Sequence, residues 1–96
     1  LYNLPSILTA IQANETVFVV EGEKDADALI AVGFPATTNS GGANKWLPEY
    51  NETFRGADVV IIPDDDVVGR QHAARVAGEL LPIVASLRIV ELNDAC

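Results

Sequence analysis

Cysteine, basic residues and long apolar runs are all scarce in this chain of 96 residues. The only cysteine is Cys96, so no disulfide and no cysteine-based metal site can form within the chain, which favours a reducing, cytoplasmic compartment. No apolar run approaches the roughly 20 residues that span a bilayer, so we expect no membrane partner. Six basic residues against fourteen acidic ones give a net charge of -8. This balance argues against a stand-alone nucleic-acid-binding protein, because phosphate affinity comes from Lys and Arg.

The length is that of a single domain with one hydrophobic core. Hydrophobic residues make up 49% of the chain, which is enough to build that core. Because the first residue is Leu1 and not methionine, we expect the chain to be part of a longer protein. Residues 1–15 are expected to form a flanking helix, and residues 16–96 the domain itself.

Strand-like and helix-like segments alternate along the chain. Strands are predicted at residues 17–20, 36–38, 59–62 and 87–92, and the first and third of these are continuous apolar runs typical of central strands. Helical periodicity is found in 5–13, after the first strand as far as Gly33, in a short stretch at 48–56, and from Gly69 to Pro82. This alternation predicts an α/β fold, a Rossmann-like three-layer α/β/α sandwich with a four-stranded parallel sheet.

Half of the acidic residues lie in two short segments, each directly after a predicted core strand. The carboxyl ends of parallel strands meet at one edge of a sheet, and neighbouring strands are about 5 Å apart. Carboxylates there repel one another unless a cation or a phosphate-handling reaction uses them, and carboxylate oxygens are the ligands that Mg²⁺ or Mn²⁺ prefers. Glu21, Asp64 and Asp66 form the predicted metal site, and Asp25 joins them from the first helical turn. The two acidic segments contain Glu21, Glu23, Asp25, Asp27, Asp64, Asp65 and Asp66.

Helix capping is the competing explanation for these acids. Acidic residues near a helix N-terminus are favoured by the helix dipole and by hydrogen bonds to free backbone N–H groups. Glu23, Asp25 and Asp66 all fit that role, and for Asp65 it is the better explanation. Two acidic segments at the same sheet edge nevertheless favour a metal or phosphate site.

The segments VVEGEKDADAL and PDDDVVGRQHA resemble a Toprim domain, the catalytic module of bacterial-type primases, type IA and type II topoisomerases and some nucleases. The family pattern is a strand followed by Glu-Gly-x-x-Asp, and later a second strand followed by Asp-x-Asp. It falls here on Glu21, Gly22, Asp25, Asp64 and Asp66, and the resemblance covers almost the whole chain. The variant most similar to this chain is that of phage, plasmid and prophage primases or primase-helicases.

The resemblance implies Mg²⁺-dependent or Mn²⁺-dependent phosphodiester chemistry. Asp64 and Asp66 would hold the metal, and Glu21, with Asp25 beside it, would act as acid/base or as a further metal ligand. The expected reaction is nucleotidyl transfer for primer synthesis, with DNA and nucleoside triphosphates as partners in the full-length protein. A basic primase subdomain, and in some relatives a helicase domain, would complete that protein.

Three alternatives remain beside primer synthesis. The first is strand cleavage, as in topoisomerases or nucleases, and the second is a Toprim-fold module that binds without catalysis. The third, a receiver domain, also has an acidic pocket, but its acidic pair follows the first strand, whereas the pair here follows the third.

Glycines and basic residues near the acidic segments are candidates for phosphate binding. The Gly-Gly pair in the loop 38–45 lets backbone N–H groups approach a phosphate, although a plain tight turn explains it equally well. The basic residues would bind phosphate or simply offset the acidic charge. His72 is predicted to be solvated, and Trp46 to lie in the core or at a domain contact. The candidate phosphate ligands are Lys24, Gly41, Gly42, Lys45 and Arg70.

Overall fold

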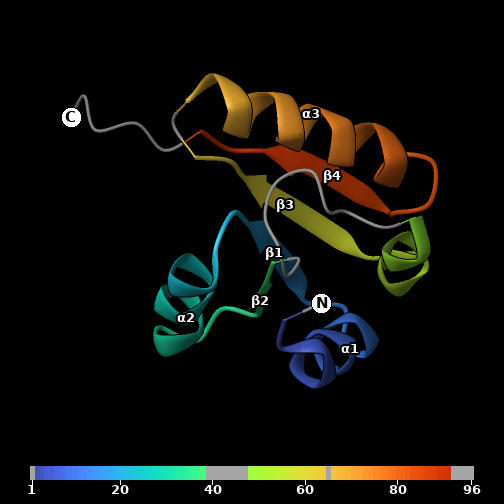
Figure 1. Ribbon diagram of the computed structural model, residues 1–96. Helices are drawn as coiled ribbons and strands as arrows, with labels where there is room; N and C mark the ends of the chain where they lie inside the picture. The colour runs from blue at the N-terminus through green and yellow to red at the C-terminus, as the bar shows by residue number, and fades with distance from the viewer. Residues whose placement is uncertain (1, 39–47, 65, 92–96) are drawn as a thin grey trace.

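A four-stranded parallel sheet forms the centre of the molecule (Figure 1). The computed structural model describes residues 2–38, 48–64 and 66–91. The strand order is β2-β1-β3-β4, which confirms the predicted α/β class. The strands are β1 (Thr16–Val20), β2 (Ala36–Thr37), β3 (Asp58–Ile62) and β4 (Ser86–Ile89).

The two central strands, β1 and β3, pair along their whole length. Thr16 is opposite Asp58 at one end and Val20 is opposite Ile62 at the other. Their sequences, TVFVV and DVVII, are rich in β-branched residues, which suit a strand that is covered on both faces. The register brings the residues that follow Val20 and Ile62 to the same sheet edge.

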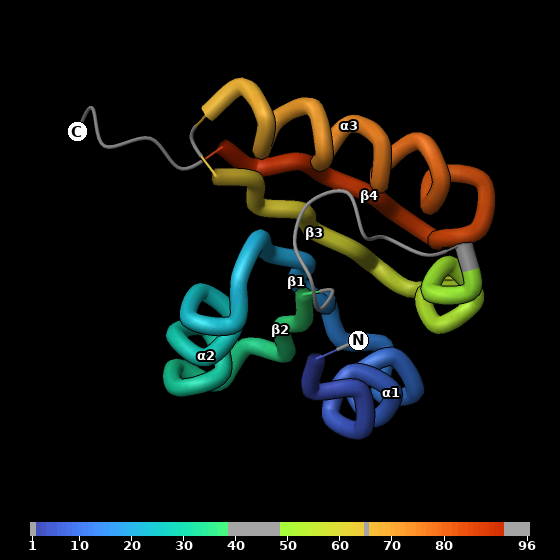
Figure 2. The backbone as a smooth tube through the Cα atoms, viewed as in Figure 1, coloured from blue at the N-terminus to red at the C-terminus, as the bar shows by residue number. Residues whose placement is uncertain are grey.

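Helical segments cover both faces of the sheet, giving three layers (Figure 2). On one face lie α1 (Leu4–Gln12), the 3₁₀ helix η2 (Pro48–Phe54) and α3 (Val67–Leu80), and on the other lies α2 (Glu23–Ala31). The alternation of side chains along β1 explains this division. Val17 and Val19 belong to the larger core with α1 and α3, whereas Val20 packs with Ala26 of α2.

Several predicted boundaries differ from the observed ones. The short helix predicted at 48–56 is the 3₁₀ helix η2, which ends at Phe54, and Phe54 is fully buried. Strand β4 ends at Ile89, short of the predicted residue 92, and α3 begins at Val67, before Gly69. The helical period of residues 69–82 also predicts a buried stripe on that helix, made of Ala73, Val76, Ala77, Leu80 and Leu81. Leu81 is instead 65% exposed, because the helix ends at Leu80 ahead of Pro82.

The flanking helix α1 is part of the domain core. Ile7 and Ala10 pack in the same cluster as the central strands. Helix α2 ends as predicted, with Gly33 just beyond it at φ 95°, a left-handed conformation that glycine adopts without strain. In the ranges that the structure describes, no helix has the length and apolar character needed to cross a membrane.

Candidate functional site

Glu21 and Asp64 lie side by side at the carboxyl edge of the sheet. Glu21 directly follows β1, and Asp64 follows β3 after Pro63, so the register of the two strands brings them together. The backbone N–H of Asp64 donates a hydrogen bond to the Glu21 carboxylate. The predicted pairing of these two acidic segments is therefore present at the sheet edge.

Both carboxyl groups are held in surroundings that disfavour their charge. Burial raises the pKa of Glu21 above its ordinary value, and the charges of Asp64, Asp66 and Asp25 raise this pKa further. The backbone N–H of Asp64 lowers the pKa, but by less than the other causes together raise it. Asp64 is exposed, and its pKa is also raised, first by partial desolvation and then by the charges of Asp25 and Asp66. These four carboxylates therefore repel one another, which is the electrostatic condition that a bound cation relieves.

Asp25 and Asp66 approach this pair from two helix N-termini. Asp25 lies in the first turn of α2 and is exposed. Asp66 is the N-cap of α3, and its Oδ1 accepts a hydrogen bond from the N–H of Gly69 at 2.5 Å. The capping explanation therefore holds for Asp66, whose side chain also acts electrostatically on Glu21 and Asp64.

Gly69 allows the acidic loop to fold tightly against α3. A Cβ atom at this position would lie 2.8 Å from the backbone oxygen of Asp64 and 2.9 Å from Oδ1 of Asp66. Both contacts are shorter than real Cβ atoms tolerate. The glycine thus lets the first turn of α3 contact the segment that carries two of the candidate ligands.

The residues fit Mg²⁺ in donor chemistry, but they do not form a complete coordination shell. Among residues 2–38, 48–64 and 66–91, no three His, Cys, Asp or Glu side chains are grouped so that they could hold a metal ion. Mg²⁺ is commonly bound through one or two carboxylates, with water and substrate phosphate as the other ligands. Glu21 and Asp64 match that smaller requirement.

Only part of the predicted phosphate-binding set can be placed. Lys24 is exposed in the first turn of α2, and Arg70 is exposed in the first turn of α3, both at the carboxyl edge. The guanidinium of Arg70 lies 4.0 Å from the Glu91 carboxylate. Gly41, Gly42, Lys45 and Trp46 lie outside the described residues.

His72 is only partly solvated, in contrast to the solvated position predicted for it. The side chain is half-buried, and its Nδ1 has no exposed surface. It lines a small cavity between α3 and the central strands, together with Glu21. The helical stripe of α3 indicated the buried positions Ala73 and Val76 but gave no sign that the neighbouring His72 would also turn inward.

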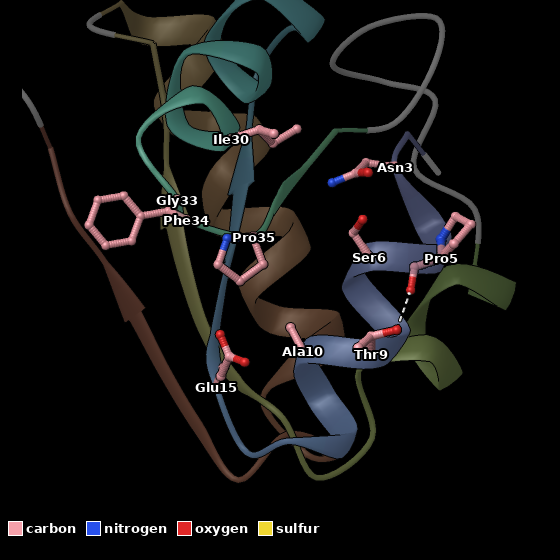
Figure 3. A pocket seen from close by; sticks show the side chains of 10 residues that line it. All are labelled: Asn3, Pro5, Ser6, Thr9, Ala10, Glu15, Ile30, Gly33, Phe34 and Pro35. Carbon is pink, nitrogen blue, oxygen red and sulfur yellow. Dashed lines mark hydrogen bonds between the residues drawn. The ribbon is translucent and has the colours of Figure 1, made fainter.

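Two larger hollows lie away from the acidic residues. One, of about 420 Å³, lies between α1 and the end of α2 (Figure 3). Glu15 and Pro35, which directly precede β1 and β2, also line it. The side chains of Asn3 and Thr9 that line it already donate hydrogen bonds to the backbone oxygens of Ala36 and Pro5. The other, of about 590 Å³, also lies by Glu15 and Phe34. Neither is at the carboxyl edge, where parallel sheets hold their ligands.

The acidic edge is thus the site that both sequence and geometry favour. Its residues come from the ends of β1 and β3 and from the first turns of α2 and α3. Compared with models of protein families, with curated proteins and with solved structures, the chain gives no match.

Proposed function

We propose that the carboxyl edge of the sheet is a Toprim-like catalytic site for metal-dependent nucleotidyl transfer, as in primer synthesis during DNA replication. The observation that carries the proposal is the side-by-side position of Glu21 and Asp64 on paired parallel strands, with the pKa of each raised. The sequence supports it through the Glu-Gly-x-x-Asp and Asp-x-Asp patterns, which have the order and spacing of Toprim domains.

Each residue has a role that its position allows. Asp64 and Glu21 would hold Mg²⁺ or Mn²⁺, and Asp66 would contribute negative charge from the cap of α3. When bound, the metal ion would offset phosphate charge and polarise the reacting oxygen. The raised pKa of Glu21 makes its carboxylate a better proton acceptor than an ordinary glutamate, which suits it to accept and return a proton. Lys24 and Arg70 would contact phosphate oxygens beside the carboxylates.

Divalent metal binding is the first test. Titration of Mn²⁺ should raise the melting temperature of the wild-type chain, because a ligand that binds only the folded state stabilises it. Glu21→Gln and Asp64→Asn should each lose most of this rise. Glu15→Gln is the matched control, since Glu15 is an exposed carboxylate before β1 at the opposite edge. Equal metal-induced shifts in all four proteins would contradict the metal site.

Activity in a longer protein that contains this domain is the second test. Glu21→Gln keeps the shape and one acceptor but removes the charge, so primer synthesis should fall by at least about 100-fold while the fold is retained. Strand cleavage without primer synthesis would favour the nuclease or topoisomerase alternative. Activity within a few-fold of wild type would remove Glu21 from the chemistry.

The capping role of Asp66 favours the second candidate, a module that binds its partner without catalysis. A carboxylate that is engaged by a backbone N–H has less capacity to hold a metal ion. The two candidate functions predict different effects of Mn²⁺ on the stability of the protein. A binding module would show no metal-induced stabilisation that depends on Glu21 and Asp64.

A further inference from the structure

The cavity between α3 and the central strands has an unusual lining. Its volume is about 10 Å³, which is at the lower limit of what a single water molecule needs. Six of the eight residues around it are aliphatic, and only Glu21 and His72 bring polar side chains. A water molecule is stable in such a place only where at least two polar groups bind it.

His72 supplies a polar atom that has no partner. Nδ1 has no exposed surface, and no hydrogen bond joins it to any residue in the described ranges. A buried polar atom without a partner is unfavourable, so native structures usually satisfy it with protein or water. The position of His72 beside the cavity makes water the available partner.

Glu21 supplies the second polar group. Its carboxylate accepts one hydrogen bond from the N–H of Asp64 and has further lone pairs to offer. His72 and Glu21 are not a direct ion pair. The pKa of His72 is lowered, through burial and the charge of Arg75, whereas a carboxylate in contact would raise it.

We propose that one buried water molecule joins Nδ1 of His72 to the carboxylate of Glu21, and that His72 thereby acts as a positioning residue for Glu21. The water donates a hydrogen bond to the carboxylate and is held at its other side by Nδ1. Together with the backbone N–H of Asp64, this water molecule fixes the orientation of the Glu21 carboxylate. The consequence for metal binding rests on the proposed function, but the link between the two side chains does not.

The link is tested without metal, by urea unfolding of the 96-residue chain in EDTA. A double-mutant cycle of His72→Leu with Glu21→Ala should be non-additive, because either change removes one end of the same hydrogen-bonded chain. His72→Leu with Asp25→Ala is the matched control, since Asp25 does not line the cavity. That pair should be additive. Additive values for the first pair would overturn the link.

The positioning role is tested by Mn²⁺ affinity and by rescue. Asn can place a polar atom where Nδ1 lies, whereas Gln places it near Nε2 and Leu has none. His72→Leu and His72→Gln should weaken Mn²⁺ binding by about tenfold, as for partners that orient metal ligands, and His72→Asn should stay within about twofold. Equal affinities in all three variants would overturn the positioning role. Absence of Mn²⁺ binding in wild type would instead contradict the proposed function, and the metal-free cycle would still decide the link.

Discussion

Glu21 is held where its negative charge opposes folding. An acid whose pKa is raised above the ordinary 4.5 binds its proton more tightly in the folded state. Its contribution to stability is therefore present below about pH 4.5 and is lost as pH rises through the folded-state pKa. In EDTA at pH 7, Glu21→Gln should raise the melting temperature by about 1–4 °C. The gain should disappear near pH 4 when melting is followed by circular dichroism across a pH series.

Glu52 is the matched control for this effect, because its pKa is shifted the other way. A hydrogen bond from Arg55 lowers the pKa of Glu52, so its contribution is present at neutral pH and is lost as pH falls. Glu52→Gln should therefore leave the melting temperature at pH 7 unchanged or slightly lower. A loss of stability in Glu21→Gln at pH 7 would mean that the fold needs this charge.

A pair of substitutions can separate the capping role of Asp66 from its proposed role in metal binding. Asn keeps the oxygen that caps α3, so Asp66→Asn should retain stability, whereas Asp66→Ala should lose about 1 kcal/mol. Urea unfolding measures both. If Asp66 also takes part in metal binding, Asp66→Asn should weaken Mn²⁺ binding despite its intact cap. Unchanged Mn²⁺ affinity in Asp66→Asn would assign Asp66 to capping alone.

Helix α3 contains two glycines with opposite expected responses to alanine. At Gly69 the new methyl group would collide with Asp64 and Asp66, so Gly69→Ala should destabilise the protein by about 1–3 kcal/mol. At Gly78 no atom beyond its chain neighbours and the backbone of its own helix lies within 4 Å of the added carbon, so alanine should stabilise the helix by about 0.5–1 kcal/mol.

The comparison of the two glycine variants tests whether close contact or helix propensity decides the outcome. Urea unfolding gives both free energies, and Mn²⁺ titration shows whether Gly69→Ala also disturbs the acidic loop. A stabilising Gly69→Ala would mean that the loop between β3 and α3 moves freely away from the helix.

The elements that the sequence predicts best are those whose pattern is dictated by burial. Strands β1 and β3 were recognisable because both faces are covered and nearly every position is apolar. Strand β4 is an edge strand with exposed residues, so its end is set by pairing with β3 rather than by composition. The start of α3 is set by the cap at Asp66, one residue before Val67, and periodicity alone missed it.

In the candidate site, too, some features were predictable from the sequence and others depend on contacts between elements. The meeting of Glu21 and Asp64 was predictable, because it needs only two neighbouring parallel strands. The inward turn of His72 was not, since a half-buried position beside the stripe of α3 has no distinctive spacing. Which atoms surround a side chain depends on packing between elements that are distant in sequence.

At the scale of the whole molecule, the charge distribution limits what the chain binds alone. The net charge is -8, and the carboxyl edge concentrates the acids, with Lys24 and Arg70 as exposed bases beside them. Nucleic acid would meet a repulsive field at this edge. A separate basic subdomain, as the Toprim resemblance implies, would supply the missing attraction.

The isolated chain should therefore bind single-stranded DNA weakly and make no primer. At physiological salt in Mg²⁺, we expect a dissociation constant of about 1–100 µM, the range of non-specific binding, measured by fluorescence anisotropy. Arg70→Ala should weaken the remaining binding and reduce its salt dependence, because Arg70 is at the carboxyl edge. Arg55→Ala should change neither, since Arg55 lies before β3 at the opposite edge and pairs with Glu52 at 2.7 Å. Nanomolar binding by the isolated chain, or equal effects of the two substitutions, would show that the domain carries a DNA site elsewhere on its surface.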